Sequence, residues 1–273
     1  MNVIYLRRRM FLGAVACLVC GLFAVAGDEP NLTKEQIKHF LATAEVVKNH
    51  QSKKGSTNTS RLTLSDGTIT HDASFQPIDE HKREMKLASG ALEMNFVDSY
   101  KYNIAAYDLA EMLGIEDMLP VYVERKYDGK KGSLSWWLPV KMDAAERYKQ
   151  KIPVPDPDAW NNQMHKIWIF DQLISDNDPN LTNLLIGEHW QIWRIDFSRA
   201  FRLNKEPKDN KELVRCDRQL FQKLKALDGN AVAEKTKGYL TKDEVEAVMT
   251  RRDKIVAYVQ KLIAEKGEKE VLY

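Results

Sequence analysis

The sequence has little of what marks the specialised classes of protein. It contains 3 cysteines, 9 prolines and 13 glycines among 273 residues, which excludes a disulfide framework and a collagen-like repeat. It has neither an internal repeat nor a low-complexity segment, and its composition is not that of a coiled coil. An apolar content of 44% excludes a wholly disordered chain. We therefore expect an ordinary globular protein that buries roughly 70–75% of its surface on folding.

An excess of charge of one sign is also missing. Lysine and arginine number 41, aspartate and glutamate number 39, and the formal net charge is +2. Three of the arginines lie within residues 1–26, which contain no acid, so the rest of the chain has 38 basic and 39 acidic residues. A near-neutral surface gives no reason to expect nucleic acid as a partner.

The first 26 residues have the pattern of a secretory signal peptide. A basic start is followed by an apolar run over 11–26, which ends in Ala-Val-Ala at 24–26, a small-x-small cleavage site. The arginines at 8–9 also fit a twin-arginine variant. The alternative is an uncleaved anchor, although about sixteen residues is slightly short of the roughly 20 that a spanning helix needs. Under either interpretation the positive flank stays inside, and the rest of the chain is exported.

The cysteines support a bacterial envelope as the location. Cys17 and Cys20 lie in the signal segment without a convincing lipobox, so Cys216 is left alone and an intrachain disulfide is impossible. An exported chain of this length without disulfides suits a bacterial envelope better than a eukaryotic secretory pathway. We expect a protein that is periplasmic or anchored to the outer face of the cytoplasmic membrane, with membrane contact only through the N-terminal segment.

The first half of the chain combines strands with helices. Turn residues, capping boxes and hydrophobic periodicity are the signals for these elements. They predict a helix that begins at the capping box Thr33-x-x-Gln36 and has apolar residues as far as Val47, followed by a hairpin over 61–78 around Asp66-Gly67. A helix over 98–113 that ends at Gly114 comes next. Strands over 119–126 and 133–140 follow, around the turn at Asp128-Gly129.

Past Pro155 the pattern becomes mainly helical. It predicts a helix capped by Asp158, short strands over 184–187 and 190–195, and helices near 211–226, 241–250 and 251–266. The fold class is therefore α+β. A small β-rich half is joined near 139–157 to a larger helical half, which is the outline of two lobes about a cleft.

A polar stretch over 176–196 is the strongest candidate for a functional site. The predicted hairpin brings Asn183 and Asp196 side by side at the mouth of the cleft. An amide oxygen and a carboxylate form a hard oxygen site that suits Mg²⁺ or Mn²⁺. Asp178 then lies where it can orient or deprotonate a hydroxyl that attacks a phosphoryl group. Asp176 is a secondary candidate that holds the loop.

Other interpretations of this stretch remain open. Asp, Asn and Pro are also common in solvated turns, and three carboxylates can form a two-metal hydrolase site. An EF-hand is disfavoured because Leu181 and Gly187 occupy the positions where that loop needs Gly and Glu. The six histidines show no metal-ligand spacing, which disfavours zinc.

The order of these residues resembles the protein-kinase-like superfamily, in particular its atypical branches: HipA-like kinases, phosphatidylinositol kinases and secretory-pathway kinases. These families have a catalytic Asp, a metal-binding Asn within D-x-x-x-x-N, a β-hairpin and a metal-binding Asp in a DFG-like turn. Asp178, Asn183 and Asp196-Phe197-Ser198 match that order. The resemblance covers roughly residues 50–205.

The resemblance implies a two-lobed kinase-like fold, with an N-lobe over 51–140 and a helical C-lobe over 141–273. The signal peptide over 1–26 and a leader helix over 27–50 precede these lobes. The resemblance also implies a cofactor site for a nucleoside triphosphate such as ATP. The implied cofactor-binding residues are Gly55, Ser56 and Thr57 in the phosphate-covering loop, Gln76 on the third strand, Asn103 on the N-lobe helix, and Leu138 in a hinge over 136–140.

Two of these positions depart from the family pattern. Gln76 stands where the family has a phosphate-binding Lys, and Asn103 stands where it has the partner Glu. An ion pair is thus replaced by an amide pair, which can hydrogen-bond but brings no positive charge to a nucleotide. The cations that can compensate from elsewhere are Arg61, Lys82, Lys86 and Arg199.

Two functions follow from the resemblance. The first is an atypical phosphotransferase that moves a phosphoryl or nucleotidyl group to a hydroxyl of an envelope protein, lipid or glycan. The second is an inactive pseudokinase, a binding or scaffold module that uses its cleft or an exposed surface at Trp136 and Trp137. A periplasm holds essentially no ATP, so an exported kinase needs an unusual donor or belongs to the second class.

Overall fold

The computed structural model describes residues 30–51, 59–86, 90–176, 180–207 and 213–273. The predicted signal peptide at 1–26 lies outside these residues. Contacts within the chain define one compact unit over Leu32–Tyr273. Within the described ranges, no helix combines the length and the hydrophobicity that crossing a membrane requires.

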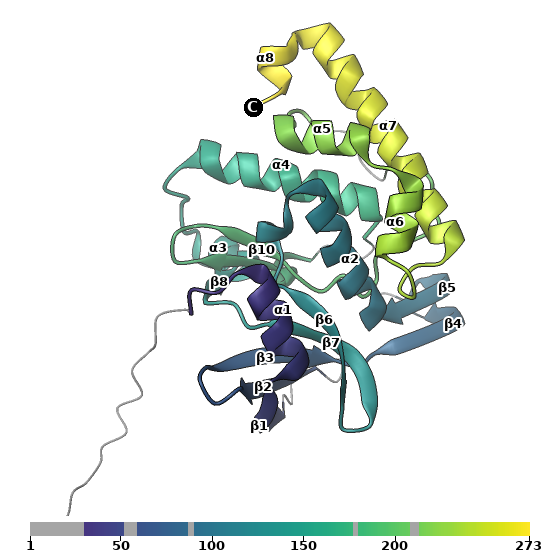
Figure 1. The fold of residues 1–273 in the computed structure, drawn as a ribbon. Helices are drawn as coiled ribbons and strands as arrows, with labels where there is room; N and C mark the ends of the chain where they lie inside the picture. Colours follow the sequence, from purple (N-terminus) through teal and green to yellow (C-terminus); the bar gives the residue numbers. More distant parts are fainter. Residues whose placement is uncertain (1–29, 52–58, 87–89, 177–179, 208–212) are drawn as a thin grey trace, which may run out of the picture. The chain divides into compact units, whose positions relative to one another are not determined.

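A five-stranded antiparallel sheet forms the first half of this unit (Figure 1). Its strand order is β1-β2-β3-β7-β6, and helix α1 packs against β6 and β7. The strong Asp66-Gly67 turn signal produced the predicted hairpin, in which β2 pairs with β3. The bounds are α1 Lys34–Thr43, β1 Glu45–Gln51, β2 Ser60–Ser65, β3 Thr70–Gln76, β6 Tyr122–Tyr127 and β7 Lys130–Trp136.

The first helix is capped as predicted but is shorter than predicted. Thr33 and Gln36 form the capping box, whereas Val46 and Val47, expected on the helix, lie in β1. The helix ends at Thr43, and β-branched residues then favour the extended backbone that pairs with β2.

A two-stranded ribbon, β4 (Asp79–Lys86) with β5 (Leu92–Ser99), leads into helix α2 (Tyr100–Leu113). The sequence did not predict the ribbon. It also placed the start of the helix two residues early, at Asp98, which pairs with Glu80 in the ribbon. Ser99 caps α2 instead, and Gly114 ends it in the left-handed conformation, as expected.

The second half begins with a small sheet of strand order β10-β9-β8. The strand predicted over 133–140 is divided, because β7 ends at Trp136 and a new strand begins at Val140. The cap of helix α4 is Asp156 rather than Asp158, since Pro157 occupies the first turn. The bounds are β8 Val140–Asp143, α3 Ala144–Gln150, α4 Pro157–Ile174, β9 Leu184–Gly187 and β10 Ile192–Arg194, with short 3₁₀ turns η1 Glu116–Met118 and η2 Leu181–Asn183.

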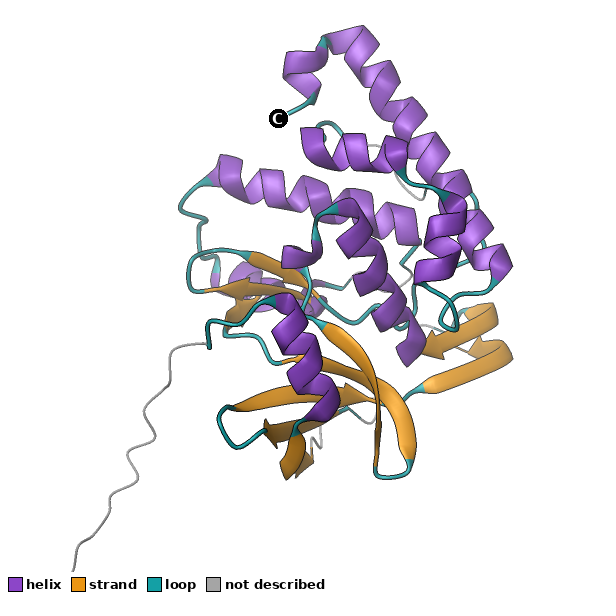
Figure 2. Ribbon diagram, viewed as in Figure 1, coloured by secondary structure: helices purple, strands orange, loops and turns teal. Residues whose placement is uncertain are grey.

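Helices complete the unit (Figure 2). The two helices predicted over 241–250 and 251–266 are one continuous helix that starts at the expected capping box of Thr241, and the helix predicted near 211–226 begins at Arg218. The bounds are α5 Arg218–Ala226, α6 Gly229–Lys235, α7 Lys242–Lys266 and α8 Glu268–Val271.

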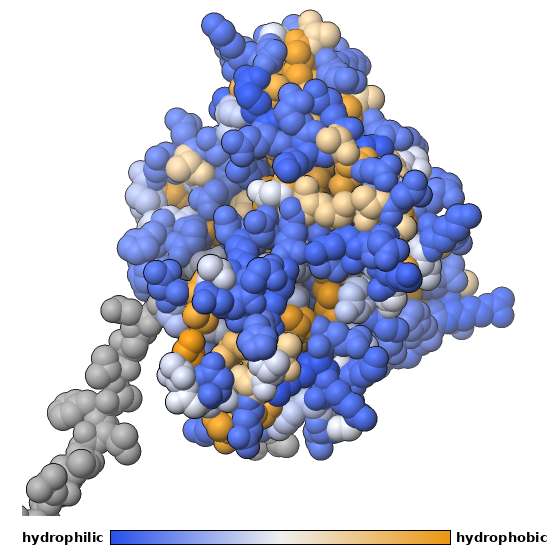
Figure 3. Space-filling view, in the orientation of Figure 1, coloured by the Kyte–Doolittle hydropathy of each residue, from blue (hydrophilic) through white to orange (hydrophobic). Residues whose placement is uncertain are grey.

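The architecture confirms the predicted α+β class, with an antiparallel sheet in the first half and helices in the second. One hydrophobic core runs through both halves. Helix α2 links them, because it packs on β6 and β7 and also on α5 and α6. Hydrophilic residues cover most of the face seen in Figure 3, so the hydrophobic core lies mainly inside.

Candidate active site in the cleft between sheet and helices

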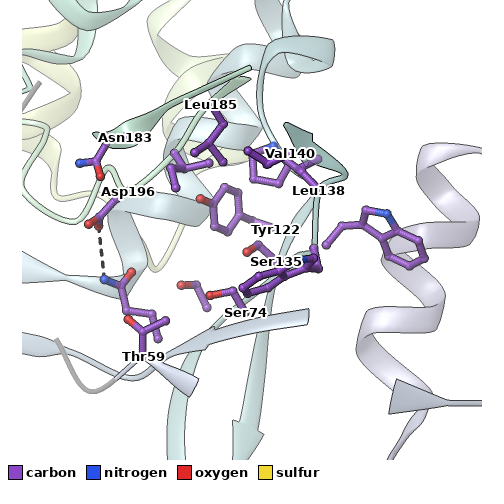
Figure 4. Close-up of a pocket in the computed structure, with 15 residues that line it drawn as sticks. Thr59, Ser74, Tyr122, Ser135, Leu138, Val140, Asn183, Leu185 and Asp196 are labelled. Carbon is purple, nitrogen blue, oxygen red and sulfur yellow. Dashed lines mark hydrogen bonds between the residues drawn. The ribbon is translucent and has the colours of Figure 1, made fainter. Parts of the chain in front are cut away.

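A cavity of about 520 Å³ lies between the N-terminal sheet and the β9–β10 hairpin. In the close-up of Figure 4, Asn183 and Asp196 lie at one end of the cavity and Leu138 and Val140 at the other. A cavity of this size is in the range of small-molecule sites. Its lining residues in the described part of the chain are Thr59, Ser74, Gln76, Pro120, Tyr122, Ser133, Ser135, Trp136, Trp137, Leu138, Val140, Asn183, Leu185, Ile195 and Asp196.

The β9–β10 hairpin brings Asn183 and Asp196 together. Asn183 is the last residue of η2, directly before β9, and Asp196 follows β10 by two residues. The backbone N–H of Ile195 donates to the carbonyl oxygen of Asn183 at 3.0 Å, which closes the hairpin at this end. Asp196 has a φ of 61°, a left-handed conformation that Asp tolerates better than most residues.

Gln76 and Asn103 form the amide pair that the sequence predicted. Asn103 Nδ2 donates to Gln76 Oε1 at 2.5 Å and to the hydroxyl of Ser133 at 3.1 Å. Gln76 Nε2 in turn donates to Asp196 Oδ1 at 3.3 Å (Figure 4). The backbone N–H of Phe197 donates to Asn103 Oδ1 at 2.7 Å. The pair therefore ties β3 and α2 to the turn that carries Asp196.

Burial and negative charge shape the electrostatics around Asp196. Burial raises the pKa of Asp98, the charge of Asp196 adds to that rise, and a hydrogen bond with Ser198 opposes it. Burial, and after it the charge of Asp196, also raises the pKa of the Tyr122 phenol, which therefore stays protonated. A second carboxylate close to Asp196 makes this corner favourable for a cation.

Asp176 is held in a buried ion pair rather than in a solvated turn. Its carboxylate accepts a hydrogen bond from Arg194 Nη2, and both side chains are almost completely buried. Asp176 directly precedes residues 177–179, which include Asp178, and these residues lie outside the described part of the chain. Gly55, Ser56 and Thr57 also lie outside it.

The predicted hinge lines the cavity, with one correction. Trp137, Leu138 and Val140 all contribute to the wall. Trp136, expected on an exposed surface, is buried, with only 6% of its surface accessible, because its ring stacks on His71 at 3.5 Å and packs on Phe40. Only Trp137, at 37%, is exposed.

The cations considered as substitutes for a phosphate-binding Lys are engaged elsewhere. Arg61 pairs with Asp72 and stacks on Trp137 at 4.3 Å, Lys82 pairs with Glu80, and Arg199 pairs with Glu93. Neither these three nor Lys86 is among the described lining residues of the cavity.

Sequence reasoning missed the hydroxyl groups on the sheet side of the cavity. Ser133 and Ser135 alternate with Leu134 and Trp136 along β7, and Ser74 lies on the neighbouring strand. The alternation of small polar and large apolar residues was the available signal, because a period of two places the serines on one face. Arg194 was also missed as part of the site.

The donor set fits a hard divalent cation such as Mg²⁺ or Mn²⁺. Asn183 offers an amide oxygen, and Asp196 offers a carboxylate at the same end of the cavity (Figure 4). Both are oxygen ligands of the type that these ions prefer. The described residues contain no cluster of three or more His, Cys, Asp or Glu side chains arranged for a metal, so a cation here also needs oxygen ligands from a substrate or water.

Solved kinase structures have the same fold. The structure of hydra Fam20 with sugar matches 88% of this chain and 91% of its own length, with a TM-score of 0.63 and 16% identity. The Golgi casein kinase with Mn/ADP bound matches 88% of this chain and 78% of its own length, with a TM-score of 0.61 and 15% identity. Both support an atypical kinase-like fold for this protein.

A bacterial structure gives the same result at lower similarity. The proinflammatory kinase CtkA of Helicobacter pylori matches 83% of this chain and 98% of its own length, with a TM-score of 0.54 and 11% identity. No protein-family model and no curated protein matches the sequence. The likeness to known proteins is therefore one of fold, as the solved structures show.

Proposed function

We propose that this protein is an atypical kinase-like phosphotransferase that uses a divalent cation and a nucleotide to modify a hydroxyl group. The observation that carries the proposal is the joint position of Asn183, Asp196 and Gln76 on one cavity with the hinge residues at its other end. A kinase site needs an oxygen ligand set for the cation at one end and an apolar wall for the base at the other.

In this proposal each end of the cavity has its own task. Leu138, Val140 and Leu185 enclose the base, and the serine hydroxyls of β7 are available to the sugar. Asn183 and Asp196 hold Mg²⁺ or Mn²⁺, which neutralises phosphate charge when it is bound. Gln76 and Asn103 keep Asp196 in position, and Asp178 orients or deprotonates the acceptor hydroxyl.

Two properties of the neighbours support the choice of ligand. The Golgi casein kinase structure contains Mn and ADP, and the hydra Fam20 structure contains a sugar. By analogy we propose a manganese or magnesium nucleotide as donor and a hydroxyl of a protein, lipid or glycan as acceptor. The signal-peptide pattern of residues 1–26 supports an envelope or extracellular location for that reaction.

Thermal denaturation of the whole chain tests the cation and nucleotide part of the proposal. Ligand at about 100 times its dissociation constant stabilises a protein by about 2.7 kcal/mol, which raises the melting temperature by about 5–10 °C at this size. We expect such a shift with ADP or ATP together with Mn²⁺, and none with nucleotide or Mn²⁺ alone. The variant Asp196→Asn tolerates the same left-handed backbone and keeps an acceptor for the Gln76 amide, so it should lose the shift while it melts close to the wild type without ligand.

The matched control is Asp253→Ala, which removes an exposed carboxylate on α7 that pairs with its neighbour Arg252. This variant should keep the full metal-dependent shift. If wild type shows no shift with any nucleotide and cation, the phosphotransferase proposal is wrong. If Asp196→Asn melts far below wild type without ligand, the charge of Asp196 has a structural role instead.

One observation favours a second function, that of a catalytically inactive binding module. The oxygen of the Gln76 amide already accepts a hydrogen bond from Asn103, and its nitrogen already donates one to Asp196. Among the described residues, no Lys or Arg lines the cavity. A site without a cation for the phosphates suits a nucleoside or another uncharged ligand better than a triphosphate. A thermal shift with adenosine that needs no metal would support this second function.

A further inference from the structure

Arg194 lies in β10, two residues before Asp196, and its side chain is only 3% exposed. Its Nη2 donates to the carboxylate of Asp176, and its Nε lies 3.5 Å from Oδ1 of Asp171. Asp171 is in the last turn of α4, and Asp176 follows the end of that helix. One guanidinium thus connects the end of α4 with the loop that precedes η2.

The same guanidinium also reaches the backbone of the proposed cation site. Its Nη1 donates to the carbonyl oxygen of Ile195 and, at 3.4 Å, to that of Asn183. Ile195 directly precedes Asp196, and its own N–H donates to the same Asn183 carbonyl. Arg194 therefore contacts the backbone of one proposed cation ligand and of the residue next to the other.

We propose that Arg194 is a positioning residue that fixes Asn183 and Asp196 relative to each other and ties Asp176 to the β9–β10 hairpin. Its assignment to a cation site rests on the proposed function. Its role in joining Asp176 to the hairpin does not. Its ion-pair and hydrogen-bond partners are Asp171, Asp176, Asn183 and Ile195.

Electrostatics keep this guanidinium charged although it is buried. Burial alone lowers the pKa of Arg194, but the carboxylates of Asp171, Asp176 and Asp196 raise it, and the net direction is upward. The guanidinium also lies over the ring of Phe197, 5.4 Å from its centroid. The planar guanidinium has five N–H donors in fixed directions and can donate to the carboxylates and the backbone carbonyls at the same time, whereas the single ammonium group of Lys cannot. Arg194→Lys therefore keeps the charge and loses the geometry.

The first experiment compares hydrogen exchange in the whole chain without ligand for wild type, Arg194→Lys and Arg252→Lys. Arg252 is the matched control, a largely buried arginine on α7 that donates to the carbonyls of Leu224 and Leu227. In Arg194→Lys we expect amides over 180–196 to exchange at least tenfold faster, with α7 unchanged. In Arg252→Lys we expect no change over 180–196.

The second experiment measures the affinity of the same proteins for Mn²⁺ with ADP by titration calorimetry. Arg194→Lys should raise the dissociation constant at least tenfold and Arg252→Lys less than twofold. If wild type binds no Mn²⁺ and ADP but exchange over 180–196 still rises in Arg194→Lys, the proposed function fails and the positioning role stands.

Unchanged exchange over 180–196 in Arg194→Lys overturns the inference, whatever the binding data. If Arg194→Lys does not fold, Asp176→Asn takes its place, because it removes the charge of one partner and leaves the carbonyl contacts of Arg194 intact. Asp176→Asn should also accelerate exchange over 180–196. If its amides there exchange at the wild-type rate, the inference is overturned as well.

Discussion

Gln76 and Asn103 form an uncharged hydrogen-bonded pair beside the turn that carries Asp196. Both side chains are buried, and each is hydrogen-bonded to the turn at 196–197. Gln76 donates to the carboxylate of Asp196, and Asn103 accepts from the backbone N–H of Phe197. An amide pair satisfies these polar groups without the desolvation cost of an ion pair. The pair therefore supports the position of Asp196 but supplies no charge.

A double-mutant cycle with Gln76→Lys and Asn103→Glu tests this argument. Asn103→Glu alone places a carboxylate at a site that is 1% exposed and has no cation opposite it, so it should cost about 3 kcal/mol. Gln76→Lys alone should cost less, because Asp196 lies 3.3 Å from the present amide nitrogen. The double variant should recover at least about 1 kcal/mol relative to the sum of the single variants.

Urea denaturation of the four proteins gives these free energies. Strictly additive effects would mean that the two side chains do not form a pair in solution. The double variant should also bind ADP with Mn²⁺ more tightly than wild type, since it brings a cation to the phosphate end of the cavity.

At the scale of elements, Gly132 determines how closely β7 approaches β3. A Cβ atom at this position would lie 2.6 Å from the carbonyl oxygen of Gln76 and 2.7 Å from the ring of Phe75. A backbone oxygen in a paired strand cannot move away as a flexible side chain can. The absence of a side chain at Gly132 is therefore a condition for the position of Gln76 at the cavity.

We expect Gly132→Ala to destabilise the fold by about 1–3 kcal/mol through overpacking and to weaken binding at the cavity by displacing the end of β3. The control is Gly229→Ala in α6, whose Cβ would meet Met249 at an ordinary 3.5 Å and should be neutral or slightly stabilising. Chemical denaturation checks both. Equal stability of the two variants would show that the backbone of β3 can shift at Gln76 without a loss of stability.

The elements that the sequence predicted are those with a local signal. The hairpin of β2 and β3 has its Asp-Gly turn, α2 has its Gly114 cap, and the β9–β10 hairpin places Asn183 beside Asp196. The ribbon of β4 and β5 has no such signal. Its first strand is charged and almost fully exposed, so hydrophobic periodicity does not distinguish it from a loop.

The same distinction applies to the site. Asn183 and Asp196 could be proposed because a motif spacing links them, and the Gln76–Asn103 pair because its two segments resemble a family pattern. Arg194 could not, because its partner Asp176 lies 18 residues away and a buried guanidinium looks like any strand residue in the sequence. The contacts of Arg194 with residues at the end of α4 depend on the packing of α4 against β10. Hydrophobic periodicity in the sequence does not reveal how two elements pack.

For the molecule as a whole, α2 is the element that joins the sheet to the helices. Asn103 connects it to β3 and to the Asp196 turn, while the Tyr102 hydroxyl donates to Glu244 on α7. Further along α2, Lys235 of α6 lies 3.0 Å from Glu111 and 3.6 Å from Asp108. The stability of the described unit therefore depends on the charges at this junction.

Asp108 makes that stability depend on pH. Burial raises its pKa from 3.8 to about 6, an effect that Lys235 opposes and Glu111 reinforces. The folded state thus binds this proton more tightly than the unfolded state, so the free energy of unfolding falls as pH rises from about 4 to about 6. A shift of this size corresponds to about 3 kcal/mol, fully expressed above pH 6.

Asp108→Asn removes the titration and should leave the protein more stable than wild type at pH 7. The difference should shrink through the interval from pH 6 to pH 4 and vanish below about pH 4, where wild-type Asp108 is protonated in both states. Urea denaturation at half-unit intervals of pH measures it, with Asp117→Asn as an exposed control. A destabilised Asp108→Asn at pH 7 would mean that its attraction to Lys235 outweighs its burial, and that α2 is held to α6 by an ion pair with a net stabilising effect.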